Sequence, residues 1–264
     1  MPDTTALLLS ELCVSCPLRL IPMFRSFDAD DLAFVQRMVA ARRSFSPEAE
    51  ILRAGEYGGG PYTLWDGWAY RYHSVPSEGG GPPRHQILDI LLPGDTFGVE
   101  AALMGRAADP VRALSEVTIC AHDSRTFLTV FNARTDLTRA ILETLLRDRI
   151  RTDARLAALG QGTGAQRAAH LMLELRDRLI GRGKLPEAAA TEPEQRIPFP
   201  LRRRHWAAAL GMSGTHVARS LAELERAQLA RVEDADVVIV DPARLAAFCG
   251  YAPPPAEQGR RALL

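Results

Sequence analysis

Residues 201–231, LRRRHWAAALGMSGTHVARSLAELERAQLAR, carry the strongest local constraint on how this chain can fold. Trp206 and Leu210 share one face at helical spacing. Gly211 follows at a position that favours the left-handed conformation in which helices often end. Ser213 then stands where a second helix would need an N-cap. The segment therefore predicts two short helices that are joined by a tight turn.

The second of these helices is expected to be amphipathic. Its inward face carries Val217, Leu221 and Leu224. Its outward face carries the polar side chains Thr215, His216, Arg219 and Ser220. A glycine-containing turn followed by an arginine-bearing outer face is typical of a helix-turn-helix motif, whose second helix enters the major groove of DNA. An ordinary helical hairpin is the alternative interpretation. The turn residues favour the helix-turn-helix motif, and so does the basic lead-in, which we define as residues 202–204 at the start of the first helix.

The chain has no net charge, so any affinity for nucleic acid must come from a local concentration of charge. Residues 196–231 supply it, because they hold seven arginines and two glutamates: Arg196, Arg202, Arg203, Arg204, Arg219, Arg226 and Arg231, with Glu223 and Glu225. We expect the basic lead-in to contact phosphates and the outer face of the second helix to approach base edges. The predicted DNA-binding residues are Arg202, Arg203, Arg204, Ser213, Thr215, His216 and Arg219.

The first half of the chain has a different sequence pattern. A short helix is expected over residues 28–41, and from 45 to 123 short β-type runs alternate with turn signals. The expected strands are 50–53, 62–65, 68–75, 86–92, 111–114 and 117–121. Asp66 and Gly67, between two aromatic runs, predict a β-hairpin, and residues 76–84 predict an exposed loop tip. Short strands at regular spacing are typical of a sandwich or a jelly-roll barrel.

A helical period follows the strands and continues to about residue 159. Charged residues interrupt its apolar stripe. The stripe consists of Leu142, Leu145, Leu146, Ile150, Leu156 and Leu159, and the interruptions are Asp148, Arg149, Asp153 and Arg155. A long helix of this kind between two domains can form a dimer seam; the alternative is that it packs only against its own barrel. An amphipathic helix over 166–180 and a β-hairpin wing from 230–232 and 237–240 are also expected.

No apolar run reaches the length of a membrane span, and residues 6–9 lack the basic residues and cleavage site of a signal peptide. Four cysteines in 264 residues do not make a disulfide scaffold. We therefore expect a cytoplasmic protein with no membrane contact.

The order of these segments, with ILRAGE, LPGDTFG, GAQRAAHLMLEL and GMSGTHVARSLAELE, resembles the Crp/Fnr family of bacterial transcription regulators over residues 13–248. The cysteines place it closer to the Fnr-like branch than to the cyclic-AMP receptor branch. The expected fold class is α+β. The expected organisation is a β-roll (jelly-roll) sensor domain with an N-terminal cysteine segment over 1–134, a dimerisation helix over 135–161, a winged helix-turn-helix domain over 162–250 and a disordered tail over 251–264.

The resemblance implies a homodimer that binds a palindromic site in double-stranded DNA, acts with RNA polymerase and is not an enzyme. Arg219 matches an arginine that the family retains on its recognition helix. Members commonly carry a glutamate where this chain has Thr215. Because that glutamate accepts a hydrogen bond from cytosine, we expect this protein not to read the family's standard half-site.

Family members that bind a cyclic nucleotide place a glutamate directly after the glycine of a phosphate loop, and later an arginine beside a serine or threonine. Here Gly98 is followed by Val99, and the acidic residue stands one position late. Arg112 is followed by Ala113, which has no hydroxyl. Because a cyclic phosphate requires both charge and hydrogen-bond donors, cyclic-nucleotide binding is not expected.

Oxygen-sensing members hold a [4Fe-4S] cluster with three N-terminal cysteines and one in a late β-roll strand. Cys13 and Cys16 match the first pair, and Cys120 in SEVTICAHD matches the late position. These three are the candidate metal ligands. Met23 stands where a related branch has its third N-terminal cysteine, so the fourth ligand is not assigned. His122 would face the same side of a strand as Cys120 and is one candidate.

Several interpretations of the cysteines stay open. They could bind a cluster with a non-cysteine fourth ligand, be small buried side chains of a degenerate site, or serve a zinc site or thiol switch. Haem bound through His73, His85 or His122 is a further alternative. The matching functions are a regulator that senses oxygen or redox state, and a constitutive regulator without a ligand. A cupin-like metal enzyme is disfavoured because the β-region histidines are scattered, with no H-x-H pair.

Overall fold

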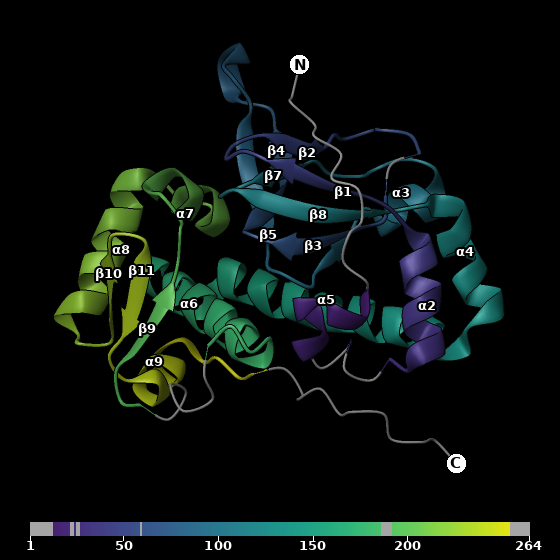
Figure 1. The fold of residues 1–264 in the computed structure, drawn as a ribbon. Coiled ribbons are helices and arrows are strands. Elements are labelled where there is room, and N and C mark those ends of the chain that lie inside the picture. The colour runs from purple at the N-terminus through teal and green to yellow at the C-terminus, as the bar shows by residue number, and fades with distance from the viewer. Residues whose placement is uncertain (1–12, 22–23, 25–26, 59, 186–191, 254–264) are drawn as a thin grey trace. The chain divides into compact units, whose positions relative to one another are not determined.

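A computed structural model of the chain describes residues 13–21, 24, 27–58, 60–185 and 192–253 (Figure 1). The described residues form two compact units. The first unit contains residues up to 73 and residues 89–146, and the second contains residues 74–88 and those from 147 onward. Nearly all of the expected C-terminal tail lies outside the described residues, as does Met23.

The N-terminal segment contains two 3-10 turns, η1 (Cys13–Ser15) and η2 (Pro17–Leu20), and then α2 (Ala29–Met38). Asp28 caps α2 by accepting a hydrogen bond from the Asp31 amide at 2.7 Å. The helix ends three residues before the expected limit. From Val39 the backbone is extended and pairs with a strand from far along the chain, so this distant partner overrides the local helical pattern.

Eight strands of the first unit form two four-stranded sheets with the orders β1-β8-β3-β6 and β2-β7-β4-β5. The strands are β1 (Val39–Phe45), β2 (Glu50–Leu52), β3 (Tyr62–Asp66), β4 (Ala69–Val75), β5 (Arg84–Leu91), β6 (Thr96–Phe97), β7 (Val111–Ala113) and β8 (Val117–His122). Each expected strand is present, and β1 and β6 are additional. The two sheets together make the β-roll that the strand spacing predicted.

The predicted hairpin at Asp66 and Gly67 is wrong. The chain does turn there, with Gly67 at φ 86°. However, β3 and β4 belong to different sheets, so the turn carries the chain from one sheet to the other. Gly67 is required for a second reason: a Cβ atom at this position would lie 2.0 Å from the carbonyl oxygen of Glu116. Turn chemistry identified the bend correctly but could not identify the strand partners.

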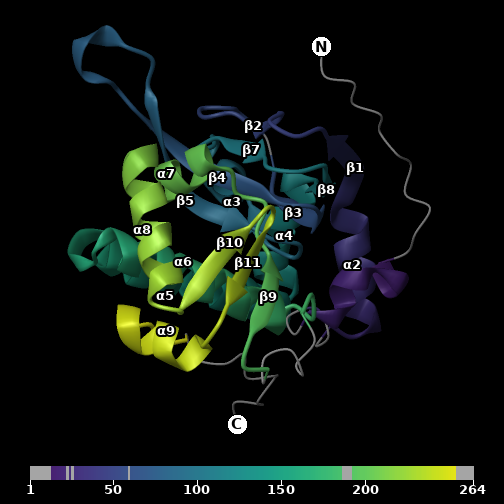
Figure 2. The same ribbon diagram turned by 90° about the vertical axis from the view of Figure 1, so that its left-hand side faces the viewer.

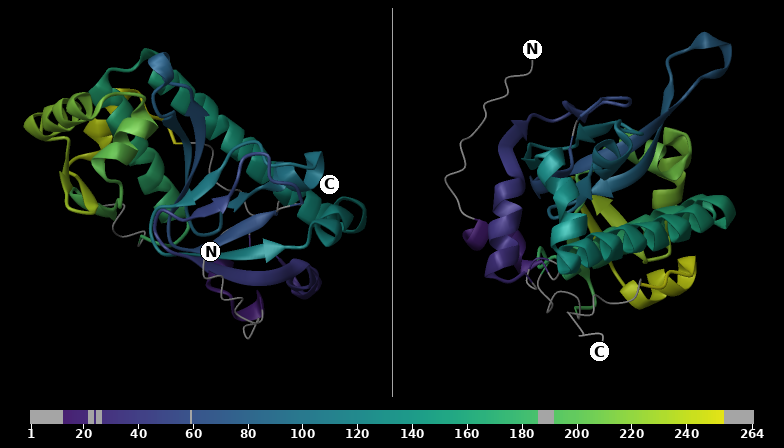
Figure 3. Two further views of the ribbon diagram at one scale, coloured as in Figure 1. Left: turned by 90° about the horizontal axis from the view of Figure 1, so that it is seen from above. Right: turned by 90° about the vertical axis from the view of Figure 1, so that its right-hand side faces the viewer.

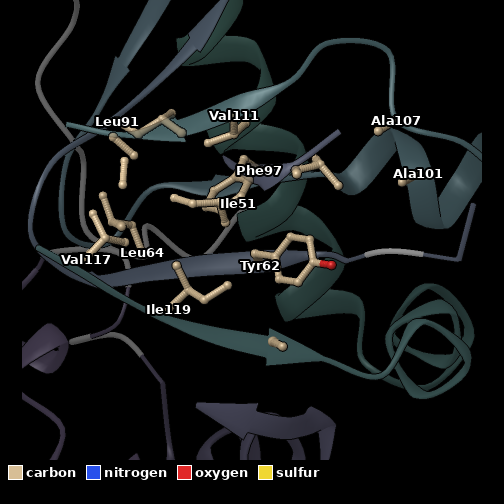
Figure 4. Close-up of a cluster of buried hydrophobic side chains, with 14 residues drawn as sticks. Ile51, Tyr62, Leu64, Leu91, Phe97, Ala101, Ala107, Val111, Val117 and Ile119 are labelled. Atoms are coloured by element: carbon tan, nitrogen blue, oxygen red, sulfur yellow. The ribbon is translucent and has the colours of Figure 1, made fainter. Parts of the chain in front are cut away.

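Buried apolar side chains from both sheets fill the interior of the roll (Figure 4). Leu64 and Ile119 are fully buried there, and the rings of Tyr62 and Phe97 lie 5.4 Å apart. The alternation along β3 and β8 explains this core, because Tyr62, Leu64, Val117, Ile119 and Ala121 all point inward. Thr63, Cys120 and His122 are therefore on the opposite, outer face of the first sheet.

Helices cover that outer face. They are α2, α4 (Ser124–Ala133) and the beginning of α5 (Thr135–Gln161), with α2 and α4 side by side (Figure 3). A further short helix, α3 (Val99–Met104), follows β6. A second apolar cluster joins α2, α4 and α5 through residues such as Leu32, Phe127 and Leu137. The sequence pattern did not predict α4 or α3 as separate helices.

The second unit contains the expected winged helix-turn-helix (Figure 2). Its elements are α6 (Gly164–Gly181), β9 (Gln195–Pro198), α7 (Arg203–Leu210), α8 (Gly214–Arg226), β10 (Ala230–Glu233), β11 (Asp236–Ile239) and α9 (Pro242–Cys249). The wing is an antiparallel sheet of order β10-β11-β9, one strand wider than predicted. Within the described part of the chain, every helix is too short or too polar to cross a membrane.

Candidate functional site

The turn between α7 and α8 is built as its sequence predicts. Gly211 ends α7 in the left-handed conformation at φ 62°, which avoids the strain that a Cβ atom would bring. Ser213 caps α8, and its hydroxyl accepts a hydrogen bond from the His216 amide at 3.2 Å. Behind the turn, Trp206 is 2% exposed and stacks on Phe199 with ring centroids 4.8 Å apart. These contacts hold the two helices at a defined angle.

The buried face of α8 differs from the prediction at one residue. Val217 and Leu224 are buried as expected, and Leu221 is half-buried. Ser220, expected on the outer face, is only 3% exposed. It lies against the first residue of α6, Gly164, where a Cβ atom would be 2.3 Å from its hydroxyl oxygen. The close approach of α6 to α8 therefore makes Ser220 an interior residue.

The other polar residues of α8 that were predicted to bind DNA lie on the surface. Thr215, His216 and Arg219 are exposed on α8, beside the capping Ser213. The His216 ring also approaches Gly164, since a Cβ there would lie 2.9 Å from its Nε2. This packing limits where the imidazole of His216 can point.

The basic lead-in lies at the start of α7, and Arg202, Arg203 and Arg204 are all exposed. The aliphatic part of Arg203 passes over the first residue of α8: a Cβ atom on Gly214 would be 3.4 Å from its Cδ. A cationic side chain therefore lies near the N-terminus of the recognition helix. Both features favour an anion such as a DNA phosphate.

Two arginines of the predicted basic concentration are neutralised within the wing. Arg196 contacts Asp236 at 3.0 Å and also Glu233. Arg231 contacts Glu194 at 2.8 Å and Glu233 at 2.6 Å. Charge counting along the sequence could not find these pairs, because antiparallel pairing of β9, β10 and β11 brings the acidic residues back to the arginines. Among the predicted contacts, the exposed arginines that are left for DNA are thus Arg202, Arg203 and Arg204 at the start of α7 and Arg219 on α8.

The long helix α5 presents its predicted apolar stripe. Five large apolar residues on it are at least 42% exposed: Leu142, Leu145, Leu146, Ile150 and Leu156. Arg155, predicted as a charged interruption of this stripe, is instead buried. Its Nε donates a hydrogen bond to the Glu174 carboxylate at 3.0 Å, and its Nη2 donates a second to the same group. Arg155 therefore does not interrupt the exposed stripe, whereas Arg149 and Asp153 stay exposed among its residues.

Cys120 stands 104 residues after Cys16 in the sequence, yet the three cysteines do come together. Cys13, Cys16 and Cys120 line one cavity of about 50 Å³ on the outer face of the first sheet. Arg42 stands opposite Cys120 in the register of β1 and β8, and its guanidinium lies over the Trp65 ring at 4.5 Å. Nothing in the sequence pattern had singled out Arg42.

The geometry of the thiols bears on each interpretation of them. Burial raises the pKa of Cys13 and of Cys120, although Arg42 acts in the opposite direction on both. Protonated thiols are poor nucleophiles, so neither residue is an activated thiolate. Among the described residues, no three His, Cys, Asp or Glu side chains gather closely enough to bind a metal ion. The three thiols alone supply fewer than the four ligands that an iron–sulfur cluster or a structural zinc site usually has.

His122 lies beside the cysteines, on the side of β8 that the alternation predicted. Its Nε2 and the Thr63 hydroxyl are 2.9 Å apart and share a hydrogen bond. Its Nδ1 is fully buried and has no hydrogen-bond partner among the described residues. Burial lowers the pKa of His122 to about 4, so the ring is neutral near pH 7. The other two histidines considered for haem, His73 and His85, are exposed and lie outside this cavity.

Arg112, compared above with a phosphate-binding arginine, lies away from the interior of the roll. Val111 and Ala113, its neighbours on β7, belong to the buried core, so Arg112 occupies the opposite face. Its Nη2 donates a hydrogen bond to the Tyr72 hydroxyl at 3.0 Å, and its guanidinium lies over the Tyr72 ring. Arg112 is thus engaged on the outside of the roll.

Comparison with known proteins agrees with this architecture. The model of the cyclic nucleotide-binding domain matches residues 42–134, and the Crp-like helix-turn-helix domain matches residues 166–248. The nitrogen fixation regulation protein FixK of Bradyrhizobium diazoefficiens is 26% identical over 236 residues, which cover 89% of this chain and 93% of that protein. The transcriptional activatory protein AadR of Rhodopseudomonas palustris is 24% identical, covering 77% of this chain and 79% of AadR.

The structure of FixK2 from Bradyrhizobium japonicum has a similar fold, with a TM-score of 0.67 at 20% identity, covering 80% of this chain and 98% of that one. A β-roll followed by a long helix and a winged helix-turn-helix defines a class of DNA-binding regulators that carry a sensor domain. The chain belongs to the Crp/Fnr family within that class. It is a FixK-like transcription regulator, and residues 166–248, within the second unit, are its helix-turn-helix DNA-binding domain.

Proposed function

We propose that the protein acts as a homodimer that reads a palindromic site in double-stranded DNA. The observation that carries the proposal is the exposed face of α8, where Thr215, His216 and Arg219 lie on a helix that is buried on its other side. The exposed apolar stripe of α5 supports the dimer, because a stripe of this kind is normally covered. Two copies would place their recognition helices about one DNA turn apart.

Selection of binding sites from a random DNA pool, combined with sedimentation of the complex, tests this proposal. We expect a palindrome with half-sites about 10 base pairs apart, occupied by two chains. Replacing Leu146, which is 60% exposed on α5, with aspartate should yield monomers and weaken binding to the palindrome. Ala154→Asp, at an exposed position of the same helix that is not part of the stripe, is the matched control. Selection of a single half-site by one chain would overturn the proposal.

The half-site itself should differ from the family's standard one. Thr215 occupies the position at which family members commonly carry a glutamate. A threonine hydroxyl selects the base that it faces less strictly than a carboxylate does. We infer that the selected site lacks the cytosine that such a glutamate would require. In a Thr215→Glu variant, the preference for that cytosine should appear.

We infer that the protein is a binding protein without catalytic activity, because both curated relatives named above are regulators. A regulator of transcription has to meet DNA and RNA polymerase, so we infer that it works with the polymerase in the bacterial cytoplasm.

We propose that the β-roll senses a signal. That the signal is oxygen or redox state, sensed through the cysteines, stays a prediction. Anaerobic purification with iron, zinc and sulfide analysis and an absorption spectrum tests the prediction. A brown protein with stoichiometric iron and sulfide would support a cluster. A colourless, metal-free protein with full DNA affinity would support the ligand-free regulator.

A further inference from the structure

The turn η1 brings two of the cysteines close together through its backbone. Cys13 is its first residue and Cys16 follows its last, and the Cys16 amide donates a hydrogen bond to the Cys13 carbonyl at 3.3 Å. A turn closed in this way holds its first and fourth Cα atoms less than about 7 Å apart. Disulfides usually join cysteines whose Cα atoms are about 4.4–6.8 Å apart. The two ends of this turn are therefore within reach of a disulfide.

The side chains of the two cysteines have a suitable direction as well. In a 3-10 turn, side chains three residues apart eclipse one another, so both thiols lie on the same side of η1. Both also line the cavity of about 50 Å³ on the outer face of the first sheet. Burial raises the pKa of Cys13, and Cys16 is the next largest cause, as expected of neighbouring thiols.

Cys120 lines the same cavity, but it has a different partner. It stands on β8 between β1 and β3, and the Arg42 guanidinium donates a hydrogen bond to its thiol. Among the described residues, no three side chains of the metal-binding types gather closely. The arrangement is therefore a pair of adjacent thiols, Cys13 and Cys16, with Cys120 as a more distant third.

We propose that Cys13 and Cys16 form a reversible intrachain disulfide by exchange with a low-molecular-weight disulfide such as oxidised glutathione. One thiolate attacks the reagent, releases one glutathione and forms a mixed disulfide. The second thiolate then displaces the other glutathione, so the S–S bond of the reagent is replaced by one in the protein. The two protons of the cysteines end on the two glutathione thiols. The proposal deepens the predicted redox sensing; only that use of the bond rests on the proposed function.

The disulfide would exclude other roles of the same pair. The thiolate is the form of cysteine that binds a metal, so a bridged pair supplies no ligand, and any metal site at these cysteines requires the reduced chain. The turn η1 contacts α2. In the oxidised state a covalent bond closes this turn, whereas in the reduced state a hydrogen bond closes it.

The test equilibrates the full chain with different ratios of reduced to oxidised glutathione. Each sample is then acidified, alkylated with N-ethylmaleimide in denaturant and digested with trypsin. Cys13 and Cys16 share the tryptic peptide 1–19, whereas Cys120 lies in 113–125 and Cys249 in 245–260. Under oxidising conditions we expect peptide 1–19 to lose two hydrogens and take up no alkyl group, and the other two to form no cross-link. Burial raises the pKa of Cys13 and slows its reaction, so equilibrium is measured rather than rate.

Two variants and one change of condition show whether the folded turn favours the bond. Cys16→Ser should leave Cys13 able to form only a mixed disulfide with glutathione. Cys249→Ser, in the second unit, is the matched control and should leave the bridge unchanged. In urea the equilibrium constant for the bridge should fall about tenfold, because the unfolded chain must lose backbone freedom that the folded turn has already lost.

Three results would overturn the proposal. Peptide 1–19 could stay alkylated or carry only mixed disulfides under oxidising conditions. It could be cross-linked to 113–125, which would make Cys120 the partner. The equilibrium constant could also be the same in urea as in the folded chain. Circular dichroism establishes that each variant is folded, and the result for the parent chain does not depend on them. These readouts involve neither DNA nor dimerisation, so a failure of the proposed function would leave them intact.

Discussion

Glu174 in the DNA-binding unit and His122 in the β-roll are both polar groups in the protein interior, but their surroundings differ. The Glu174 carboxylate is 3% exposed and is held by both Nε and Nη2 of Arg155, with Arg151 at 3.5 Å and Arg178 at 3.6 Å. His122 has one hydrogen bond, to Thr63, and its other ring nitrogen has none among the described residues.

The difference indicates what each group contributes to its unit. A buried charge with complete partners is a structural joint, here between α5 and α6, and it leaves the function of its unit to the exposed face of α8. A buried nitrogen with incomplete partners contributes no such joint and is unfavourable where it stands. Glu174 is thus a fully paired group, whereas His122, on the outer face of the first sheet, keeps one buried ring nitrogen without a partner among the described residues.

The largest expected effect is on Glu174. Replacing it with alanine leaves Arg155 buried without its carboxylate, so the free energy of unfolding should fall by about 3–5 kcal/mol. Urea denaturation measures this loss. Glu143→Ala, which breaks an exposed pair with Arg139 on α5, is the matched control and should change stability by no more than about 0.5 kcal/mol. Equal effects of the two variants would remove the contrast between a structural joint and a surface pair.

An intermediate effect is expected on DNA binding rather than on stability. Arg219→Ala should weaken binding to the selected site by about 1–3 kcal/mol and relax the preference at one base pair. Fluorescence anisotropy with a set of single-base variants of the site measures both. Arg231→Ala removes an arginine that is already paired with Glu194 and Glu233, and it should leave that preference unchanged. A uniform loss of affinity at every sequence would reduce Arg219 to a phosphate contact.

The smallest expected effect is on His122, the other buried group in this comparison. His122→Leu removes the buried nitrogen that has no partner and keeps the apolar volume, so the free energy of unfolding should change by less than about 1 kcal/mol. The same urea experiment measures it. A loss as large as that of Glu174→Ala would mean that the ring is a structural joint, and the distinction drawn between the two groups would not hold.

The DNA-binding unit was predictable because its information is local. Trp206, Gly211 and Ser213 define two helices and a turn within a few residues, and periodicity assigned most of the α8 faces correctly. Ser220 was misplaced because its partner, Gly164, lies more than fifty residues away. The arginines of the wing were counted as available charge for a similar reason, since their acidic partners return to them only when the three strands pair.

The sensor was less predictable because its information is distributed. Alternation along β8 placed Cys120 and His122 on one face, and the resemblance to cysteine-bearing family members brought Cys13 and Cys16 to it. No local pattern could reveal the cavity that the cysteines line, because its lining runs from Cys13 to His122 in short separate pieces. The turn at Asp66 and Gly67 makes the same point, because its strands pair with β6, β8 and β7 and not with each other.

The ion pairs of the wing have a consequence for how the protein behaves in salt. Arg196 is 53% exposed and Arg231 is 31% exposed, so added ions screen the contacts that fasten β9 to β10 and β11. Ions also compete directly for DNA phosphates. Raising the ionic strength therefore weakens binding to DNA and, at the same time, weakens the ion pairs between the strands of the wing. Affinity should decline with salt more steeply than the number of phosphate contacts alone would give.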